Sequence, residues 1–235
     1  MRIARILVPG AKGAQRTAFL IGGLSILGML FLWLWSEIAA GHLAKIDNSI
    51  LLAFRSSTNL KILSGPDWLP DILRTITILG DSKFLIVLVI LVAAYLVARR
   101  TYYFALVLLA SSVSGMMIVA LLKDRFSRPR PEFVEHLATQ YSMSFPSGHA
   151  ANSAVVYLTM AMLFNQIRPE SRTRIYLVPA ALVLTATIGI SRVALGVHWP
   201  SDVVAGWMFG LSWAYFWVLT LNCPASQSNA TSQKN

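Results

Sequence analysis

The sequence predicts an all-α protein that forms a polytopic bundle of membrane-spanning helices. Hydrophobic residues make up 56% of the 235 residues and charged residues only 13%, whereas soluble domains carry about 25% charged residues. The mean hydropathy is +0.61. The apolar residues gather in six stretches close to the roughly 20 residues that a membrane-spanning helix needs. This composition excludes a disordered chain, a coiled coil and a disulfide-stapled secreted module.

The six predicted spans follow one another through nearly the whole chain. They comprise residues 18–35, 84–98, 101–122, 147–167, 175–190 and 203–222. The first is longer than the roughly 7–15 apolar residues of a signal peptide, so we expect a retained anchor. We expect one integral-membrane domain over residues 1–223. A disordered tail, rich in Ser, Asn and Gln, follows over residues 224–235.

The charge distribution orients the predicted bundle. Six spans place both termini on one side, together with Arg99, Arg100 and the loop over residues 166–174. The opposite loops hold as many Lys and Arg residues, but the first of them is long and therefore counts less. The basic residues after the third span have a chemical role, described below. We therefore expect cytoplasmic termini, and loops after the first, third and fifth spans on the outer face of the cytoplasmic membrane.

The net charge of +10 would suggest nucleic acid in a soluble protein. In a membrane protein we assign it to topology and to anionic lipid headgroups or substrates, and we expect no nucleic-acid partner. The long first loop, residues 40–82, contains helix-like apolar spacing at residues 50–54 and 68–79. These short helices either lie on the membrane surface or cover one end of the bundle.

Three short segments concentrate the polar residues of this apolar chain. They are residues 123–131 (KDRFSRPRP), 145–149 (FPSGH) and 191–202 (SRVALGVHWPSD). Each lies at the end of a predicted span, and the six-span topology places all three at the same membrane face. The sequence therefore predicts that these distant segments build one site.

The basic residues of these segments suit a phosphate. Lys123, Arg130 and Arg192 supply three positive charges, and an arginine binds phosphate oxygens through a planar fork. Ser147 and Gly148 stand at a predicted helix start, where free N–H groups and the helix dipole favour an anion. The absence of a side chain at Gly148 lets a phosphate approach the backbone.

Two histidines and an aspartate complete the candidate site. A neutral histidine can attack phosphorus, and a second histidine can protonate the leaving oxygen. Asp202 follows His198 by four residues, so it can hold one imidazole nitrogen and leave the other free to react. Pro200 favours the first position of a helix, which places His198 at the entrance of the sixth span. These residues together predict phosphoryl transfer.

The three segments resemble the signature motifs of the type-2 phosphatidic acid phosphatase superfamily, whose site is shared with vanadium haloperoxidases. The matching patterns are Lys123-x6-Arg130-Pro131, Pro146-Ser147-Gly148-His149 and Ser191-Arg192-x5-His198-x3-Asp202. All eleven specified positions match in order and spacing. The resemblance implies an acid phosphatase/vanadium haloperoxidase-like helical core and a membrane lipid phosphatase.

The resemblance also implies a role for each matched residue. His198 is the nucleophile that forms a phosphohistidine, Asp202 orients it, and His149 is the general acid and then the base. The residues that bind the phosphate are Lys123, Arg130, Arg192, Ser147 and Gly148. No metal and no other cofactor is expected, and membrane lipids with a phosphate or diphosphate group are the expected substrates. These include undecaprenyl diphosphate, phosphatidic acid, phosphatidylglycerophosphate and the lipid A phosphate.

Other interpretations remain open at this point. Arg125 and Arg128, and in part Lys123, are readily explained as interfacial charges at the end of a span. Asp202 and Arg192 could form a structural ion pair. The phosphohistidine could pass to a second lipid in place of water, which would make the protein a phosphotransferase. A transporter or scaffold is disfavoured, because the predicted spans are nearly free of the charged residues that a transport path needs. The sequence leaves the oligomeric state open.

Overall fold

The computed structural model describes residues 11–138, 142–167 and 172–221 of the chain. Over these residues the chain forms eight α-helices and no β-strand. The helices are α1 (Ala11–Ala39), α2 (Ala44–Ala53), α3 (Leu69–Ile78), α4 (Ser82–Ala98), α5 (Tyr102–Phe126), α6 (Gly148–Ile167), α7 (Arg174–Ala194) and α8 (Pro200–Leu221). The all-α prediction is confirmed. The predicted disordered tail lies outside the described residues.

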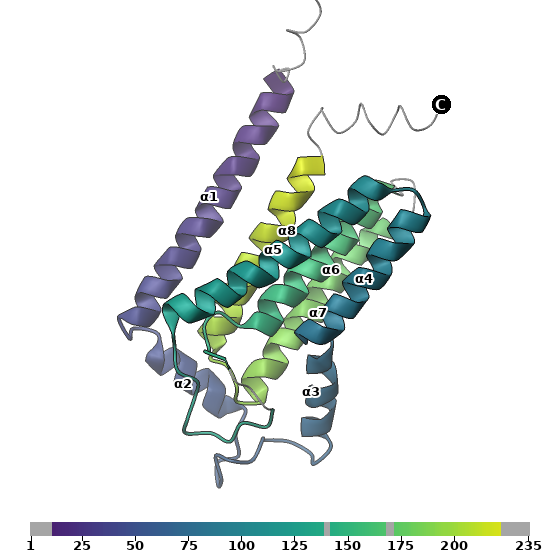
Figure 1. Cartoon of the computed structure of the whole chain (residues 1–235). Coiled ribbons are helices and arrows are strands. Elements are labelled where there is room, and N and C mark those ends of the chain that lie inside the picture. Colours follow the sequence, from purple (N-terminus) through teal and green to yellow (C-terminus); the bar gives the residue numbers. More distant parts are fainter. Residues whose placement is uncertain (1–10, 139–141, 168–171, 222–235) are drawn as a thin grey trace, which may run out of the picture.

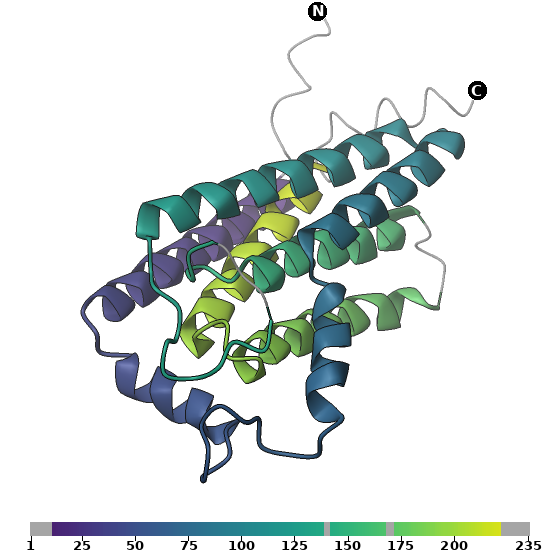
Figure 2. The same cartoon turned by 60° about the horizontal axis from the view of Figure 1, so that its bottom comes forward.

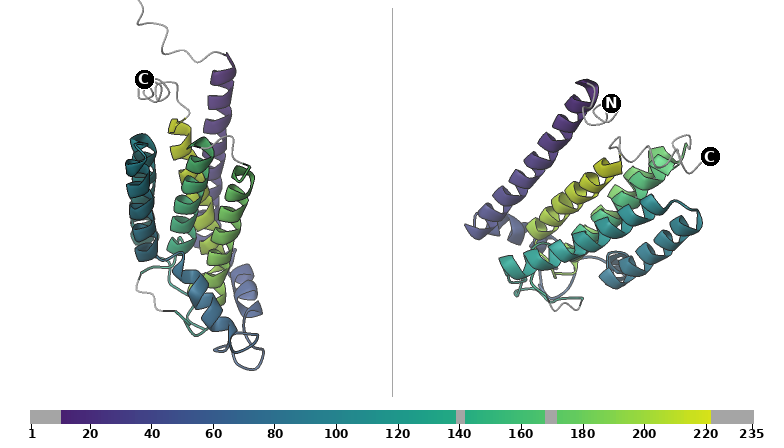
Figure 3. Two further views of the ribbon diagram at one scale, coloured as in Figure 1. Left: turned by 90° about the vertical axis from the view of Figure 1, so that its right-hand side faces the viewer. Right: turned by 45° about the horizontal axis from the view of Figure 1, so that its top comes forward.

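The long helices run side by side, and the two short helices α2 and α3 lie at the same end of the bundle, on different sides of it (Figure 1). Helix α6 is central: it packs on α8, α7, α5 and α4. Helix α1 stands at the edge and contacts α8 (Figure 3). The short helices of the long first loop therefore cover one end of the bundle, as one of the two sequence interpretations expected.

The central position of α6 explains its composition. More than half of its residues are buried, and these are mostly small or weakly polar: Ala150, Ala151, Asn152, Ser153, Ala154, Val155, Val156, Leu158, Thr159, Ala161 and Leu163. A helix in the middle of a membrane bundle meets other helices on every side, so close packing of small residues stabilises it more than bulky apolar groups do. Helix α6 is accordingly less apolar than α4 and α8, which pack on it.

Two glycines let α8 approach α6 closely. A Cβ at Gly206 would lie 2.7 Å from the carbonyl oxygen of Ser147, and one at Gly210 would lie 2.5 Å from the Cβ of Ala154. The Gly206-x3-Gly210 spacing is a small-residue motif that places both glycines on one helix face. This contact matters for the site below, because α6 and α8 begin beside one another at the end that carries the polar segments.

The number of membrane spans is only partly established. Three helices are long and apolar enough to cross a membrane: Ile21–Ala39, Tyr102–Phe126 and Ile175–Ala194. A fourth crossing arises if α3 and α4, which are bent by 44° at a short break, act as one broken span. The described parts of α6 and α8 do not meet this criterion, so the six-span count is not confirmed and stays a prediction.

We predict that Gly210→Val disrupts the α6–α8 contact. A side chain at Gly210 would meet the Cβ of Ala154 at 2.5 Å and the carbonyl oxygen of Ala151 at 2.6 Å, so the helices must move apart. Overpacking of this kind costs about 1–3 kcal/mol, measurable as a lower melting temperature in detergent. Gly28→Val is the matched control, because no atom lies within 4 Å of a Cβ at Gly28. An equal loss in both variants would contradict the predicted contact.

Candidate active site

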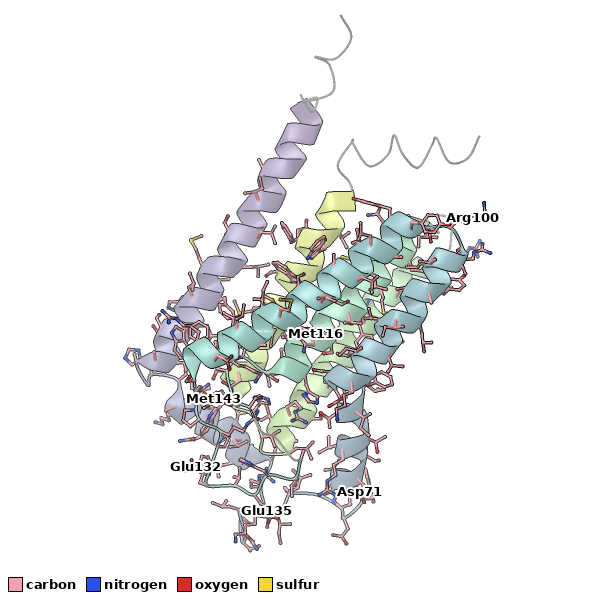
Figure 4. The ribbon with its side chains drawn as sticks, in the orientation of Figure 1. Asp71, Arg100, Met116, Glu132, Glu135 and Met143 are labelled. Carbon is pink, nitrogen blue, oxygen red and sulfur yellow. The ribbon has the colours of Figure 1, made fainter. Side chains whose placement is uncertain are left out.

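The three polar segments meet at the end of the bundle that carries α2 and α3. The loop after α5 crosses this end and leads into α6, and the loop between α7 and α8 lies beside it (Figure 2). Figure 4 shows Glu132 and Met143 of the loop after α5 at this end, whereas Arg100 lies at the opposite end. The predicted convergence of distant segments is therefore confirmed.

His198 lies at the centre of this end and is 1% exposed. Its Nε2 is 3.3 Å from Nη1 of Arg130. Its Nδ1 is 3.5 Å from Oδ2 of Asp202 and 3.4 Å from the hydroxyl oxygen of Ser144. One ring nitrogen thus faces a carboxylate and a hydroxyl group, and the other faces a guanidinium.

The short connection between α7 and α8 buries His198. Helix α7 ends at Ala194, and Gly196 follows with a φ of +76°, a left-handed conformation that glycine adopts without strain. Helix α8 then begins at Pro200, as the sequence predicted. Asp202 lies in the first turn of α8, so the four-residue spacing brings its carboxylate back to the imidazole.

The three predicted cations lie around His198 and the start of α6. Arg130 donates to the carbonyl oxygen of Ser142 at 2.9 Å and to that of Val197. Lys123 donates to the carbonyl oxygen of Met143 at 2.6 Å. The Cε of Lys123 also lies 3.4 Å from the Cβ position of Gly148. Backbone carbonyl groups therefore hold two of the cations beside the N-terminus of α6.

Arg192 and Ser147 retain polar atoms that no group in the described part of the chain satisfies. Arg192 is 1% exposed, and its Nη1 donates to Oγ1 of Thr77 at 2.9 Å. Its Nε and Nη2, and the hydroxyl oxygen of Ser147, are buried without a partner among the described residues. Buried donors of this kind are costly unless a ligand binds them. Their chemistry fits the oxygens of a phosphate group.

His149 opens α6, beside the bend between α3 and α4. A Cβ at Gly80 would lie 2.5 Å from Cγ2 of Ile188 and 3.3 Å from the Cβ of His149, so a larger residue at this part of the bend would clash with α7. Arg192, His198, Lys123 and Arg130 lie close enough to act on His149 electrostatically. The two histidines and three cations of the sequence prediction therefore share one site.

The electrostatic environment keeps His198 neutral. Its pKa lies well below the usual range, first because burial disfavours the imidazolium and then because Lys123, Arg130 and Arg192 repel a further positive charge. The pKa of Arg130 is also lowered by burial, although Asp202 opposes this shift. A neutral imidazole retains the lone pair that attack on phosphorus requires.

The structure corrects two of the open interpretations. Arg128 is not an interfacial charge: its guanidinium is 14% exposed and lies 2.6 Å from Oδ1 of Asp202 and 2.8 Å from Oδ2 of Asp47. The salt-bridge partner of Asp202 is therefore Arg128, and Arg192 turns to Thr77 instead. The reason is spatial, because Arg128 in the loop after α5 and Asp202 in the first turn of α8 are far apart in sequence but reach the same point.

Sequence reasoning missed four residues of this region: Asp47, Thr77, Arg128 and Ser144. Ser144 donates to Oδ2 of Asp202 and contacts the imidazole, yet a lone serine carries no recognisable signal. Asp47 and Thr77 belong to the long first loop, whose position over the bundle end could not be deduced from the sequence. Arg128 offered the one usable signal, a basic residue two positions before Arg130.

The buried histidine, the neighbouring carboxylate and the three cations at one end of a helical bundle form the kind of site expected of a membrane phosphatase. The chain belongs to the PAP2 superfamily, which matches residues 104–223. Phosphatidylglycerophosphatase B of Bacillus subtilis is 32% identical over 185 residues, which are 77% of this chain and 88% of that protein. An undecaprenyl-diphosphatase of Sulfolobus acidocaldarius is 39% identical over 83 residues, 35% of this chain and 34% of that one.

The fold agrees with a solved structure of the same family. The crystal structure of a transmembrane PAP2-type phosphatidylglycerolphosphate phosphatase from Bacillus subtilis has a TM-score of 0.76 and 31% sequence identity to this chain. The similarity covers 85% of this chain and 95% of that one. The helical arrangement around the candidate site is therefore that of a PAP2 phosphatase.

We predict that His198 makes the folded state less stable in acid. In the unfolded chain a histidine takes up a proton near pH 6.5, whereas the folded protein keeps His198 neutral well below that pH. Protons therefore favour the unfolded chain below pH 6.5, and stability falls as the pH falls. Between pH 7.5 and 5.5 the loss from this residue is about 1 kcal/mol. Chemical unfolding of wild type and His198→Gln in detergent measures it, and the same pH dependence in both would contradict the prediction.

Proposed function

We propose that this membrane phosphatase hydrolyses a phosphate or diphosphate monoester of a lipid through a phosphohistidine on His198. The observation that carries the proposal is the position of the His198 imidazole. It is buried, faces a carboxylate on one side, and meets the guanidinium of Arg130 with Nε2 at 3.3 Å on the other. A phosphate held by the three cations would therefore present its phosphorus to a nucleophilic nitrogen.

In the first half of the reaction, Nε2 of His198 attacks phosphorus, and the bond from phosphorus to the lipid oxygen breaks. His149 donates a proton to that oxygen, and the negative charge of the phosphate offsets the cations around His149 so that it can carry this proton. Asp202 stabilises the positive charge that develops on the imidazole. In the second half, His149 removes a proton from water, which attacks the phosphohistidine and releases inorganic phosphate.

The cations stabilise charge as the phosphorus changes its bonding. Lys123, Arg130 and Arg192 bind the equatorial oxygens, on which the transition-state charge is spread. Gly148 and the hydroxyl of Ser147 add hydrogen bonds from the N-terminus of α6. Because Arg192 and Ser147 already lie buried with unsatisfied donors, little rearrangement is needed when the phosphate binds.

The similarity to phosphatidylglycerophosphatase B extends over most of the chain and supports a glycerophospholipid phosphate as the first substrate to test. The shorter match to an undecaprenyl-diphosphatase supports a polyprenyl diphosphate as the second. The same chemistry serves both, because the attacked phosphorus is in each case a terminal phosphate on a lipid. The hydrocarbon part lies in the membrane while the headgroup enters the polar end of the bundle.

We further propose that the protein resides in the cytoplasmic membrane with cytoplasmic termini and its active site at the outer face. The turn between α4 and α5 carries Arg99 and Arg100 at the end opposite the site (Figure 4). The positive-inside rule assigns such a short basic turn to the cytoplasm. The site would then meet lipids that present their phosphates in the outer leaflet.

We predict that His198→Asn abolishes phosphate release from phosphatidylglycerophosphate, phosphatidic acid and undecaprenyl diphosphate in detergent micelles. Loss of a nucleophile should lower kcat by at least about a thousandfold. Label from substrate carrying radioactive terminal phosphate should also attach to wild type and not to the variant. His42→Asn is the matched control, because that histidine is exposed and pairs with Glu37. Undiminished turnover by folded His198→Asn would refute the phosphohistidine.

We predict opposite accessibility for the two ends of the bundle. On a Cys223→Ser background, Glu132→Cys should react with a membrane-impermeant maleimide in spheroplasts, because Glu132 is exposed beside the site. Arg99→Cys, also at an exposed position, should react only after the membrane is permeabilised. The reverse pattern would place the active site at the cytoplasmic face.

A further inference from the structure

Asp202 is held from behind by two charged residues that the matched motifs do not include. Asp47 lies in α2, and Arg128 lies in the loop after α5. Nη1 of Arg128 is 2.6 Å from Oδ1 of Asp202, and Nη2 is 2.8 Å from Oδ2 of Asp47. The guanidinium therefore bridges two carboxylates, one of which adjoins the imidazole of His198.

This bridge is buried and well satisfied. Asp47 is 2% exposed and Asp202 is fully buried, so both carboxylates depend on hydrogen bonds and on the one guanidinium for their stability. The indole ring of Trp199 lies 5.3 Å from the guanidinium carbon of Arg128, where the ring face attracts a cation. The hydroxyl of Ser201 lies between Arg128 and Asp47, at 2.8 Å and 2.6 Å.

Arg128 determines which oxygen of Asp202 is available to the imidazole. Oδ1 accepts from Arg128, whereas Oδ2 accepts from the hydroxyl of Ser144 and from the backbone N–H of Trp199 at 3.0 Å. With both oxygens engaged, the carboxylate is held in one orientation. Oδ2 is then directed at Nδ1 of His198, 3.5 Å away, and Nε2 is left to face the phosphate.

Asp47 also secures the helix that carries Asp202. Its Oδ1 accepts from the backbone N–H of Ser201 at 2.9 Å, in the first turn of α8. A carboxylate at a helix N-terminus is stabilised by the free N–H groups and the helix dipole. One side chain of α2 therefore positions both Arg128 and the start of α8.

We propose that Asp47 and Arg128 are positioning residues for the nucleophile, with Asp47 acting on His198 through Arg128 and Asp202. This inference rests on the proposed function, since it concerns the same site. As Nε2 bonds to phosphorus, positive charge develops on the imidazole, and Asp202 stabilises it. Without Asp47, the positive charge of Arg128 would cancel the negative charge of Asp202 and weaken its attraction for the imidazolium. Asp47 offsets this effect by pairing with the other side of the guanidinium. Two carboxylates and one guanidinium leave a single net negative charge behind the imidazole.

The proposal separates effects on catalysis from effects on substrate binding. Asp47 touches Arg128 and Ser201, and the phosphate-binding groups lie on the other side of the imidazole. Asp47→Asn should therefore lower kcat roughly ten- to a hundredfold, the loss typical when a hydrogen-bond partner of a metal-binding histidine is removed, and leave KM within about threefold. Arg128→Lys, which keeps the charge and loses the fork, should retain more activity than Arg128→Gln.

The relay predicts that the two positions are not independent. If Asp47 acts through Arg128, adding Asp47→Asn to Arg128→Gln should change kcat by less than about threefold, because the link is already broken. Two separate structural roles would give effects on kcat that multiply. The matched controls are Asp124→Asn and Arg125→Gln, which make the same charge changes at exposed positions near the end of α5. These controls should leave kcat unchanged.

All variants are compared as monodisperse protein below their melting temperatures, with dioctanoyl phosphatidylglycerophosphate as substrate. Wild-type kcat in folded Asp47→Asn would overturn the proposal, as would multiplying effects in the double variant. Should Asp47→Asn fail to fold, Arg128→Lys carries the same test, because it keeps the charge and loses the fork that joins Asp47 to Asp202. A lower kcat there with KM within about threefold supports the relay, and a wild-type kcat overturns it.

Orthovanadate separates this inference from the proposed function. Vanadate resembles the five-coordinate phosphorus bonded to His198, so its binding depends on the orientation of the imidazole and not on the identity of the lipid. Its protection of wild type against thermal unfolding should be weakened in Asp47→Asn and unchanged in Asp124→Asn. If no lipid phosphate is hydrolysed, the proposed function fails, and equal protection by vanadate of Asp47→Asn and wild type would separately overturn the relay.

Discussion

The architecture of the site depends on the interactions of the buried Asp202 carboxylate. Its side chain joins Arg128 of the loop after α5, Ser144 of the loop before α6 and the imidazole of His198. Its backbone carbonyl oxygen also accepts from the N–H of Ser147 at 3.0 Å. One residue in the first turn of α8 therefore connects every segment that supplies chemistry. Such a fully buried charge is stable only if all of these partners are present together.

The second constraint is the gathering of positive charge around a neutral imidazole. Lys123, Arg130 and Arg192 repel one another, and each is partly removed from water. Carbonyl oxygens of the loop before α6 and of Val197 accept hydrogen bonds from Lys123 and Arg130. The hydroxyl oxygen of Thr77 accepts one from Arg192. Repulsion among the cations and their remaining donors favour binding of an anion with several oxygens. Burial lowers the pKa of His198 first, and the same cations lower it further, so the groups that attract an anion also help to keep the imidazole neutral.

The helix packing serves this arrangement. Because Gly206 and Gly210 admit the backbone of α6, the first turns of α6 and α8 lie close enough for Ser147 to reach Asp202. The long first loop contributes from the other side, since α2 supplies Asp47 and the region of α3 and α4 supplies Thr77 and Gly80. The short helices at the end of the bundle thus contact residues of the site and fix their positions, in addition to covering this end of the bundle.

The sequence by itself determined the helical membrane class, the family and the motif residues. Apolar stretches of membrane length and the spacing of Lys123, Arg130, His149, His198 and Asp202 are local properties, which a linear chain displays. Even the start of α8 at Pro200 could be deduced, because proline suits the first position of a helix. The span count was less accessible, since α6 packs against other helices with small and weakly polar residues and its described part is not apolar enough to count as a span by composition alone.

Only the tertiary structure decided which charged groups are partners. Asp47, Thr77 and Ser144 carry no motif, and Arg128 resembles an ordinary interfacial charge until α2 and the start of α8 converge on it. The physical reason is that hydrogen bonds and ion pairs depend on distances of about 3 Å between atoms. Asp47 is separated in sequence from Arg128 by 81 positions and from Ser201 by 154 positions. Residues so far apart come within hydrogen-bonding distance only through the packing of the whole bundle.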